Sequence, residues 1–311
     1  MAEAPSWLWI PVVLFSAIAQ TTRNAAQRSL TGTAGPMAAT LVRFLYGLPF
    51  AFAYVLVLQV ASDPGTAVPH VTGAYAAWLV LGALAQAMAT ALLVASMQRG
   101  NFVIAVTYSK TEVLQVAGLG ALLLHELPTA PALVAMTVAV AGVVLLAIPR
   151  MQFSASAGWR GLGPAALCGL GAGGCFAVAV ISYRAAGLEF MRAGPYSVWY
   201  AGGWTILLAQ ALQSAVICGW MAWRSRPQLL LVFSSWRISA IAGLAGAVAS
   251  VTGVTAYILR PAADVRALSM VEVVLSYVVS RRMMHERIST IEQAGLILVM
   301  AGVAGVCLAA R

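Results

Sequence analysis

The hydrophobic positions of this chain fall into ten long apolar runs, separated by short breaks that carry Gly, Pro or charged residues. A helix that crosses a bilayer needs roughly 20 mainly apolar residues. The runs have this length, so the pattern predicts ten membrane-spanning helices. Their approximate bounds are 7–28, 36–59, 73–97, 101–123, 130–149, 162–182, 195–221, 237–259, 262–280 and 290–310.

The pattern also repeats along the chain with an offset of 160 residues. Three motifs recur without a gap: Ser109, Glu112 and Val113 as Ser269, Glu272 and Val273; His125-Glu126 as His285-Glu286; and Ala141-Gly142-Val143 as Ala301-Gly302-Val303. The offset pairs the fourth run with the ninth and the fifth with the tenth. It predicts two five-helix repeats, residues 1–150 and 151–311. An odd number of helices per repeat places the two copies in opposite orientations in the membrane.

Composition supports the membrane assignment. The chain of 311 residues is 61% hydrophobic and 9% charged, whereas soluble domains carry about 25% charged residues. We therefore predict an all-α polytopic membrane protein whose partner is the lipid bilayer. The net charge of +9 does not indicate a nucleic-acid partner, since basic residues are expected at the ends of membrane helices. The four cysteines show no metal-ligand spacing, and no cofactor is expected.

Polar stripes on several predicted helices indicate a central binding site. An ionisable side chain near the bilayer centre costs about 2.5–3.5 kcal/mol, so such residues usually face a cavity or a partner. Tyr108, Thr111, Glu112 and Gln115 share one helix face by their i, i+3, i+4, i+7 spacing. The candidate substrate-binding residues are Arg23, Asn24, Gln27, Arg43, Gln86, Tyr108, Glu112, Gln115, Trp199, Tyr200 and Glu272.

Several of the charged and aromatic residues also have a structural interpretation. Glu112 and Glu272 can bind substrate or a proton, or they can form ion pairs with Arg43, Lys110 or Arg266. Lys110 can bind a substrate carboxylate or pair with another helix. Arg266 and Asp264 lie near the start of the ninth run, where an interfacial network is the simpler interpretation. The aromatic set around Trp199 and Tyr200 can be an interfacial belt or a cavity wall.

The duplicated His-Glu pairs do not predict a metal site. A zinc protease motif needs His-Glu-x-x-His, and the fifth positions here are Thr129 and Ser289. Both residues instead predict N-caps of the following helices, and Ser289-x-x-Glu292 has the pattern of a capping box.

Ten helices, two five-helix copies and a Glu at the junction before the fifth and the tenth helix resemble the drug/metabolite transporter superfamily, in its EamA-like branch. Arg43 in Leu41-Val42-Arg43-Phe44 adds to the resemblance. The resemblance implies a basket of helices around a central cavity that opens to alternate sides of the membrane. Such proteins usually move small metabolites, often outward, and need no nucleotide. Members generally have a Gly before the junction Glu, whereas this chain has His125 and His285.

The resemblance and the residues together predict a secondary transporter, an exporter or exchanger, and not an enzyme. A cavity with both cationic and anionic side chains suits a zwitterion such as an amino acid, with protons as a candidate coupling ion. The alternatives are a non-transporting scaffold, a lipid-translocating subunit and an intramembrane lipid-modifying enzyme. The enzyme would need a paired-Asp site, and the chain has only Asp63 and Asp264. We expect a monomer or a homodimer.

The expected location is the cell (inner) membrane, with both termini on one side. The breaks after odd-numbered runs hold eleven Arg residues and the opposite side holds four. By the positive-inside rule this bias puts both termini outside the cytoplasm, while the family resemblance implies cytoplasmic termini. Both orientations stay open.

Overall fold

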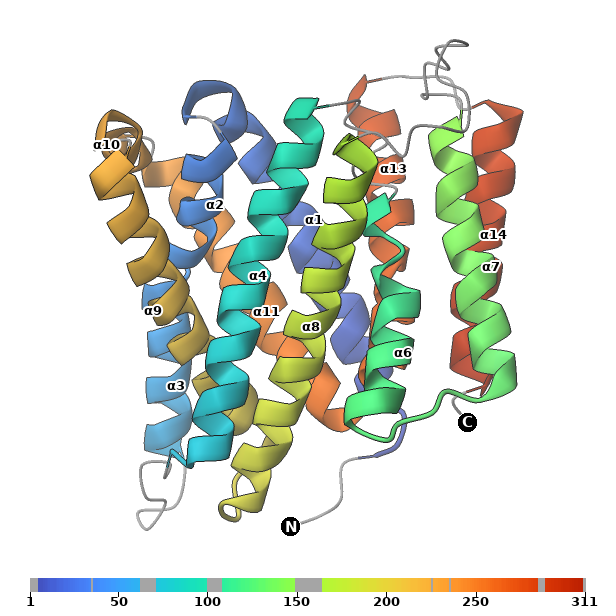
Figure 1. Ribbon diagram of the computed structural model, residues 1–311, viewed down its shortest axis with the longest axis horizontal. Coiled ribbons are helices and arrows are strands. Elements are labelled where there is room, and N and C mark those ends of the chain that lie inside the picture. The colour runs from blue at the N-terminus through green and yellow to red at the C-terminus, as the bar shows by residue number, and fades with distance from the viewer. Residues whose placement is uncertain are drawn as a thin grey trace. The chain divides into compact units, whose positions relative to one another are not determined.

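The computed structural model describes residues 5–34, 36–61, 71–99, 108–148, 164–224, 226–234, 236–284 and 289–309. Within these ranges every regular element is a helix (Figure 1). The helices are α1 (Trp9–Ala34), α2 (Pro36–Leu45), α3 (Leu48–Ala61), α4 (Gly73–Arg99), α6 (Glu112–Leu123), α7 (Ala130–Ala147), α8 (Pro164–Arg192), α9 (Val198–Arg224), α10 (Arg226–Ser234), α11 (Trp236–Leu259), α12 (Ala262–Ser269), α13 (Val271–Met284) and α14 (Thr290–Ala309).

The described helices confirm an all-helical protein that crosses the membrane several times. Seven stretches are long and apolar enough to span a bilayer: Thr40–Ala61, Gly73–Leu93, Ala130–Ala147, Ala166–Arg192, Val198–Arg224, Trp236–Leu259 and Thr290–Ala309. The predicted first run ends in a polar segment, the fourth is described as a helix only over Glu112–Leu123, and the ninth is broken into α12 and α13. The full set of ten spanning helices stays a prediction.

Contacts divide the chain into two compact units, and neither is continuous in sequence. Unit 1 comprises Met1–Leu84 and Ser182–Arg260, and unit 2 comprises Ala85–Ile181 and Pro261–Arg311. Each unit therefore combines segments from both predicted repeats. Helices α4 and α8 contribute residues to both units. That residues 1–150 and 151–311 are inverted copies stays a prediction.

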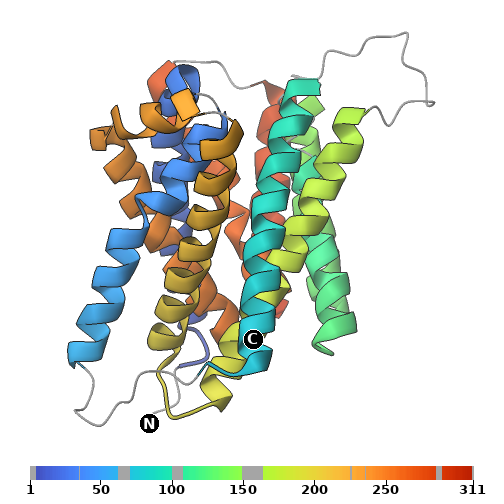
Figure 2. The ribbon, with the colours of Figure 1, turned by 60° about the vertical axis from the view of Figure 1, so that its left-hand side comes forward.

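Unit 1 is built around the packing of α2 and α11 against α1 and α9, and α3 lies beside α9 (Figures 1 and 2). One apolar face of α2 carries Ala38, Leu41, Val42 and Leu45, at helical spacing. Its buried members join Phe44 and residues of α9, α10 and α11 in a core cluster. Pro49 has no N–H to bond with the carbonyl of Leu45, which explains why α2 ends there and α3 begins anew.

A buried arginine in unit 1 holds the C-terminal end of α11. This helix ends at Leu259, since the residue before Pro261 is disfavoured in a helical conformation. Arg184 of α8 is buried, and its Nη1 donates to the carbonyl oxygens of Tyr257 and Arg260, the latter at 2.6 Å. Arg184 is one of the four Arg residues counted above on the side opposite to the eleven, and it lies within a helix rather than in a loop.

We expect Arg184→Leu to destabilise the protein by about 2–4 kcal/mol, because hydrogen bonds to a charged group are each worth about 1.5–3 kcal/mol. Thermal unfolding of purified protein in detergent measures the loss. Arg192→Leu is the matched control, since Arg192 lies on the same helix but is largely exposed and pairs with Glu189 at the surface. The control is expected to lose about 0–1 kcal/mol. Equal losses for both variants would show that Arg184 does not stabilise the C-terminal end of α11.

Unit 2 is dominated by the contact of α7 with α14, which lie side by side (Figure 1). A Cβ atom added at Gly142 would lie 2.8 Å from the Gly295 carbonyl oxygen and 2.6 Å from the Val299 nitrogen. One added at Gly302 would lie 2.6 Å from the Ala135 carbonyl oxygen and 2.6 Å from the Ala139 nitrogen. Glycines are required at both positions for so close an approach.

The contact between α7 and α14 is formed by equivalent residues of the two predicted repeats, which are 160 positions apart. Gly142 corresponds to Gly302, and the partners of Gly302, Ala135 and Ala139, correspond to Gly295 and Val299, the partners of Gly142. A contact in which each copy uses the same surface is what a two-fold relation between α7 and α14 produces.

Candidate functional site

The fourth and ninth hydrophobic runs both have a break in the helix, at equivalent positions. A helical piece at Tyr108–Ser109 is separated from α6 by a turn at Lys110 and Thr111, and α12 is separated from α13 at Met270. Lys110 and Met270 are 160 residues apart. Thr111 closes the first turn, because its Oγ1 donates to the Tyr108 carbonyl oxygen at 2.7 Å. Interrupted helices at corresponding positions of two repeats are typical of the binding sites of secondary transporters.

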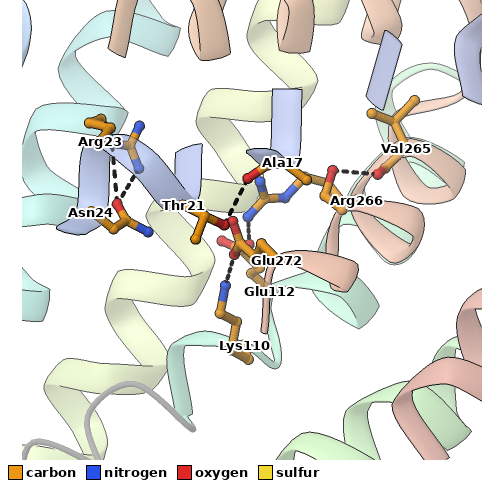
Figure 3. A network of polar contacts seen from close by, with 10 residues as sticks. Ala17, Thr21, Arg23, Asn24, Lys110, Glu112, Val265, Arg266 and Glu272 are labelled. Carbon is orange, nitrogen blue, oxygen red and sulfur yellow. Dashed lines mark hydrogen bonds and ion pairs between the residues drawn. The ribbon is translucent and has the colours of Figure 1, made fainter. Parts of the chain in front are cut away.

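Two ion pairs join these breaks within unit 2 (Figure 3). The Lys110 ammonium binds a Glu272 carboxylate oxygen, and the Arg266 guanidinium binds a Glu112 carboxylate oxygen. Each pair takes one residue from the first predicted repeat and one from the second, and each repeat supplies one cation and one anion. The structural interpretation of Glu112 and Glu272 as ion-pair partners is confirmed, and so is the pairing of Lys110 with another helix.

The four charged side chains of this cluster are mostly buried. The Glu112 side chain is 4% exposed, that of Glu272 8%, and those of Arg266 and Lys110 15% and 19%. Arg266 also interacts electrostatically with Glu272, so the two pairs are coupled. Removing charges from water costs several kcal/mol per ion even when they are paired. Apolar residues at these positions would avoid this cost, which favours a functional reason for the charges.

Helix ends contribute to the electrostatics of the charge cluster. Glu112 and Glu272 lie in the first turns of α6 and α13, where the positive end of the helix dipole stabilises a carboxylate. Arg266 lies in the last turn of α12, where a cation is favoured. The Arg266 Nε–H is buried and has no hydrogen-bond partner among the described residues. This donor is available to an anionic ligand group.

The polar face predicted on α6 is present. Gln115 Nε2 donates to Thr111 Oγ1 at 3.1 Å, and Tyr108 is half-buried at the start of the same segment. Gly173 and Gly174 of α8 leave room for this face, because a Cβ at Gly173 would lie 3.2 Å from Gln115 Nε2 and 3.1 Å from the Ser109 carbonyl oxygen. Gln86, also in unit 2, is half-buried on α4, and its carbonyl oxygen accepts from Thr90 at 2.9 Å.

The other predicted site residues lie in unit 1. Arg23 is buried on α1, and its Nη2 donates to Asn24 Oδ1 at 2.8 Å (Figure 3). Arg43 lies over the Phe44 ring. A Cβ added at Gly246 of α11 would lie 3.4 Å from Arg23 Cδ and 3.5 Å from Arg43 Cγ, so this glycine brings the two arginines together. The side chain of Gln27 lies outside the described part of the structure.

The aromatic residues Trp199 and Tyr200 differ in their surroundings. Tyr200 is buried, stacks on Tyr196 at 5.6 Å between ring centroids and donates a hydrogen bond to Gln59. Phe190 and Trp204 also pack against it. Trp199 is half-buried. Tyr200 is thus part of a packed aromatic cluster, which favours a structural role over a ligand-stacking one.

The duplicated His-Glu motif forms a helix junction where it is described. The backbone of His125 has a φ of 55°, in the left-handed region, and follows the end of α6. Thr129 caps α7 by accepting from the Ala132 N–H at 3.4 Å. Ser289 and Glu292 form the predicted capping box, with reciprocal bonds of 2.9 and 3.3 Å. Both capping predictions are confirmed. His285 and Glu286 lie outside the described residues. Among the residues that are described, no group of three metal-ligating side chains occurs.

Sequence reasoning missed one functional candidate and two buried amides. Arg266 was assigned to an interfacial network, but it lies buried against Glu112. Gln210 and Gln213 are both buried in the middle of α9. Two amides well inside an apolar run were a usable signal, because polar side chains inside membrane helices seek partners across helix interfaces.

Comparison with known proteins identifies the first half of the chain. Residues 7–148 match the model of the EamA-like transporter family. This part of the chain is similar to that family. EamA-like proteins form a branch of the drug/metabolite transporter superfamily, so this match agrees with the resemblance that the sequence predicted. The apolar helices support a multi-pass membrane protein.

A structural comparison covers nearly the whole chain. A solved structure described as "Crystal structure of protein" has a TM-score of 0.72 and 19% sequence identity, and the match covers 97% of this chain and 98% of that chain. This comparison shows the fold alone. No curated protein sequence matches the chain.

Proposed function

We propose that this EamA-like protein is a secondary transporter of a small zwitterionic metabolite, such as an amino acid, working by alternating access. The observation that supports this proposal is the reciprocal pair of ion pairs at the two helix breaks of unit 2. Lys110 and Arg266 can bind a carboxylate, and Glu112 and Glu272 can bind an ammonium group. A zwitterion supplies both charges, so it can replace protein partners without leaving a buried charge unpaired.

The binding step in this proposal is an exchange of partners. The cargo carboxylate takes the place of a Glu at Arg266, where the buried Nε–H offers a second donor. The cargo ammonium takes the place of a cation at Glu112 or Glu272. Because each pair joins the two predicted repeats, opening a pair also releases a link between α6 and the α12–α13 segment. This release couples cargo binding to movement of the broken helices.

The proposal further comprises the predicted binding residues of unit 2, which are Gln86, Tyr108, Glu112, Gln115 and Glu272, with protons as the candidate coupling ion. The proposed location is the cell membrane. Protonation of Glu112 or Glu272 would open an ion pair in the same way as the cargo ammonium does. A scaffold without transport activity is the competing function, and it would use the same ion pairs as permanent structural links.

A matched set of solutes tests the charge requirement. Purified protein in liposomes is assayed for uptake of radiolabelled L-leucine, of 4-methylpentanoate, which lacks the ammonium group, and of isoamylamine, which lacks the carboxylate. We expect uptake of the zwitterion above that of protein-free liposomes, and no comparable uptake of either singly charged analogue. A broader panel of amino acids is screened in the same assay, with and without a pH gradient. Failure of every zwitterion in the panel would contradict the proposed function.

A further inference from the structure

The connection between α9 and α11 in unit 1 is a short helix, α10, rather than a polar loop (Figure 1). It has nine residues and is about 14 Å long, too short to cross a hydrocarbon core of roughly 30 Å. Both neighbours are candidate membrane spans, Val198–Arg224 and Trp236–Leu259. Since α10 joins the ends of two spans, it lies at the level of the membrane surface.

Packing fixes which side of α10 faces the protein. Val232 is 1% exposed and belongs to the core cluster of unit 1, and Leu229, three residues before it, packs against the same cluster. The Tyr46 hydroxyl donates to the Val232 carbonyl oxygen at 3.2 Å. These contacts hold Leu229 and Val232 on the inner side, so the opposite side of the helix faces outward.

The outward face of α10 combines a cation with large apolar side chains. Arg226, Leu230 and Phe233 follow the i, i+4, i+7 spacing of one helix face. All three are exposed, Leu230 at 70% and Phe233 at 54%. An exposed apolar face beside an arginine is typical of a helix that lies in the membrane interface, with its apolar side chains among the lipid acyl chains.

The two helix ends next to α10 carry the same Trp-Arg pair. Trp223-Arg224 ends α9, and Trp236-Arg237 begins α11. Both tryptophans are exposed, at 85% and 59%, and both arginines are exposed as well. The Arg237 guanidinium lies 5.5 Å from the centroid of the Trp236 ring. Tryptophans are enriched at the level of the lipid headgroups, so Arg224 and Arg237 lie where the lipid phosphates are.

The positive charge of this surface is not balanced by the protein. The chain has no Asp or Glu between residues 190 and 263. Within the described residues, Arg224, Arg226 and Arg237 form no ion pair. Arg226 Nε donates to the Ala222 carbonyl oxygen at 3.0 Å, which ties its guanidinium to the end of α9. Three exposed cations without a counter-charge from the protein favour an anionic partner in the membrane.

We propose that this surface binds anionic phospholipid: Arg224, Arg226 and Arg237 bind headgroup phosphates, and Leu230 and Phe233 contact the acyl chains. Charge complementarity supports this assignment, because a guanidinium can donate two parallel hydrogen bonds to a phosphate and basic residues close to a membrane surface attract anionic lipids. Phosphatidylglycerol fits this chemistry better than phosphatidylcholine, whose choline group brings a positive charge to the same arginines. The proposal does not depend on the transport function, since the lipid is a component of the membrane and not the cargo.

Lipid competition measures the preference directly. Purified protein in detergent is mixed with equimolar phosphatidylglycerol and phosphatidylcholine of the same acyl chains, and the retained lipid is counted by native mass spectrometry. The wild type is expected to retain phosphatidylglycerol in about fivefold excess or more, the contribution of one basic residue near anionic lipid. The triple variant Arg224→Gln/Arg226→Gln/Arg237→Gln loses most of this excess. Equal retention of the two lipids by the wild type, or an unchanged excess in the triple variant, overturns the proposal.

Arg192→Gln is the matched control for the triple variant. Arg192 is also exposed and lies in unit 1, but Glu189 supplies its counter-charge. This variant keeps the preference of the wild type for phosphatidylglycerol. A loss as large as that of the triple variant would show that the preference does not come from the surface around α10, and would overturn the proposal.

Thermal unfolding in detergent gives a second readout and distinguishes a lipid from a free anion. Phosphatidylglycerol should raise the unfolding midpoint of the wild type and of Arg192→Gln by more than that of the triple variant. Phosphatidylcholine and inorganic phosphate at the same concentration should have no such effect. A midpoint raised equally by inorganic phosphate would indicate a free-anion site and overturn the assignment to lipid. An equal shift of the wild type and the triple variant by phosphatidylglycerol overturns it as well.

Discussion

Replacement of Glu112 by Gln is expected to destabilise the protein by about 3–5 kcal/mol, because it leaves the buried Arg266 guanidinium without its carboxylate. Arg266→Met is expected to cost a similar amount, since it leaves the Glu112 carboxylate, 4% exposed, without its cation. Thermal or chemical unfolding in detergent measures both losses. Glu189→Gln is the matched control, because its partner Arg192 is largely exposed and the pair contributes at most about 1 kcal/mol.

The double variant Glu112→Gln/Arg266→Met removes both charges together. It should recover most of the stability that either single variant loses, because neither charge is left unpaired. The difference between the double variant and the sum of the single variants gives the coupling energy of the pair. Additive losses would mean that the two side chains do not interact in the folded protein.

Transport measurements on the same variants distinguish a functional ion pair from a structural one. The double variant is expected to be folded and inactive, because Arg266 can no longer bind the cargo carboxylate and Glu112 can no longer bind its ammonium group. If the folded double variant transports zwitterions as the wild type does, over the whole pH range, the Glu112–Arg266 pair is structural. Lys110→Met/Glu272→Gln applies the same test to the second pair.

The sequence predicted the class of protein and the position of the charge cluster, but not the pairing within it. Hydropathy alone indicates membrane helices, and the 160-residue offset located Glu112 and Glu272 as equivalent residues. The two cations of the cluster have no equivalent cation at an offset of 160 residues. Arg266 corresponds to Val106 and Lys110 to Met270, so each Glu pairs with a cation whose position is not duplicated. Which cation each Glu pairs with depends on where the helices are broken, and the hydropathy pattern does not indicate these breaks.

The helix breaks show why local sequence was insufficient. Pro49 explains the break after α2, and such a break is readable from sequence. The breaks at Lys110–Thr111 and Met270 contain neither Pro nor Gly. Local side-chain bonds of Thr111 to the Tyr108 carbonyl oxygen and of Ser269 to the Val265 carbonyl oxygen accompany them. The contacts that join the two breaks are the long-range ion pairs. Arg184 illustrates the same limit, because its role as a clamp on α11 depends on a contact between residues far apart in sequence.

The glycines of the α7–α14 contact lead to the second large effect. Gly302→Ala is expected to destabilise unit 2 by about 3 kcal/mol or more, because the new methyl group would lie 2.6 Å from backbone atoms of Ala135 and Ala139. Backbone atoms cannot rotate away as side chains do, so the helices must separate and lose their packing. By the reciprocity of the contact, Gly142→Ala should cost a similar amount, since its methyl group would lie 2.6 Å from the Val299 nitrogen.

Gly118→Ala is the control for both variants. Gly118 lies on α6 in the same unit, and a Cβ atom added there meets nothing within 4 Å. This change should be neutral or stabilise by about 0.5–1 kcal/mol, because Gly is the poorer helix residue. Thermal unfolding of the three variants in one detergent gives the comparison. If Gly302→Ala is as stable as Gly118→Ala, the close approach of α7 and α14 is not present in the protein. If Gly302→Ala is destabilised and Gly142→Ala is not, the contact lacks the two-fold character that links the repeated motif to the packing of unit 2.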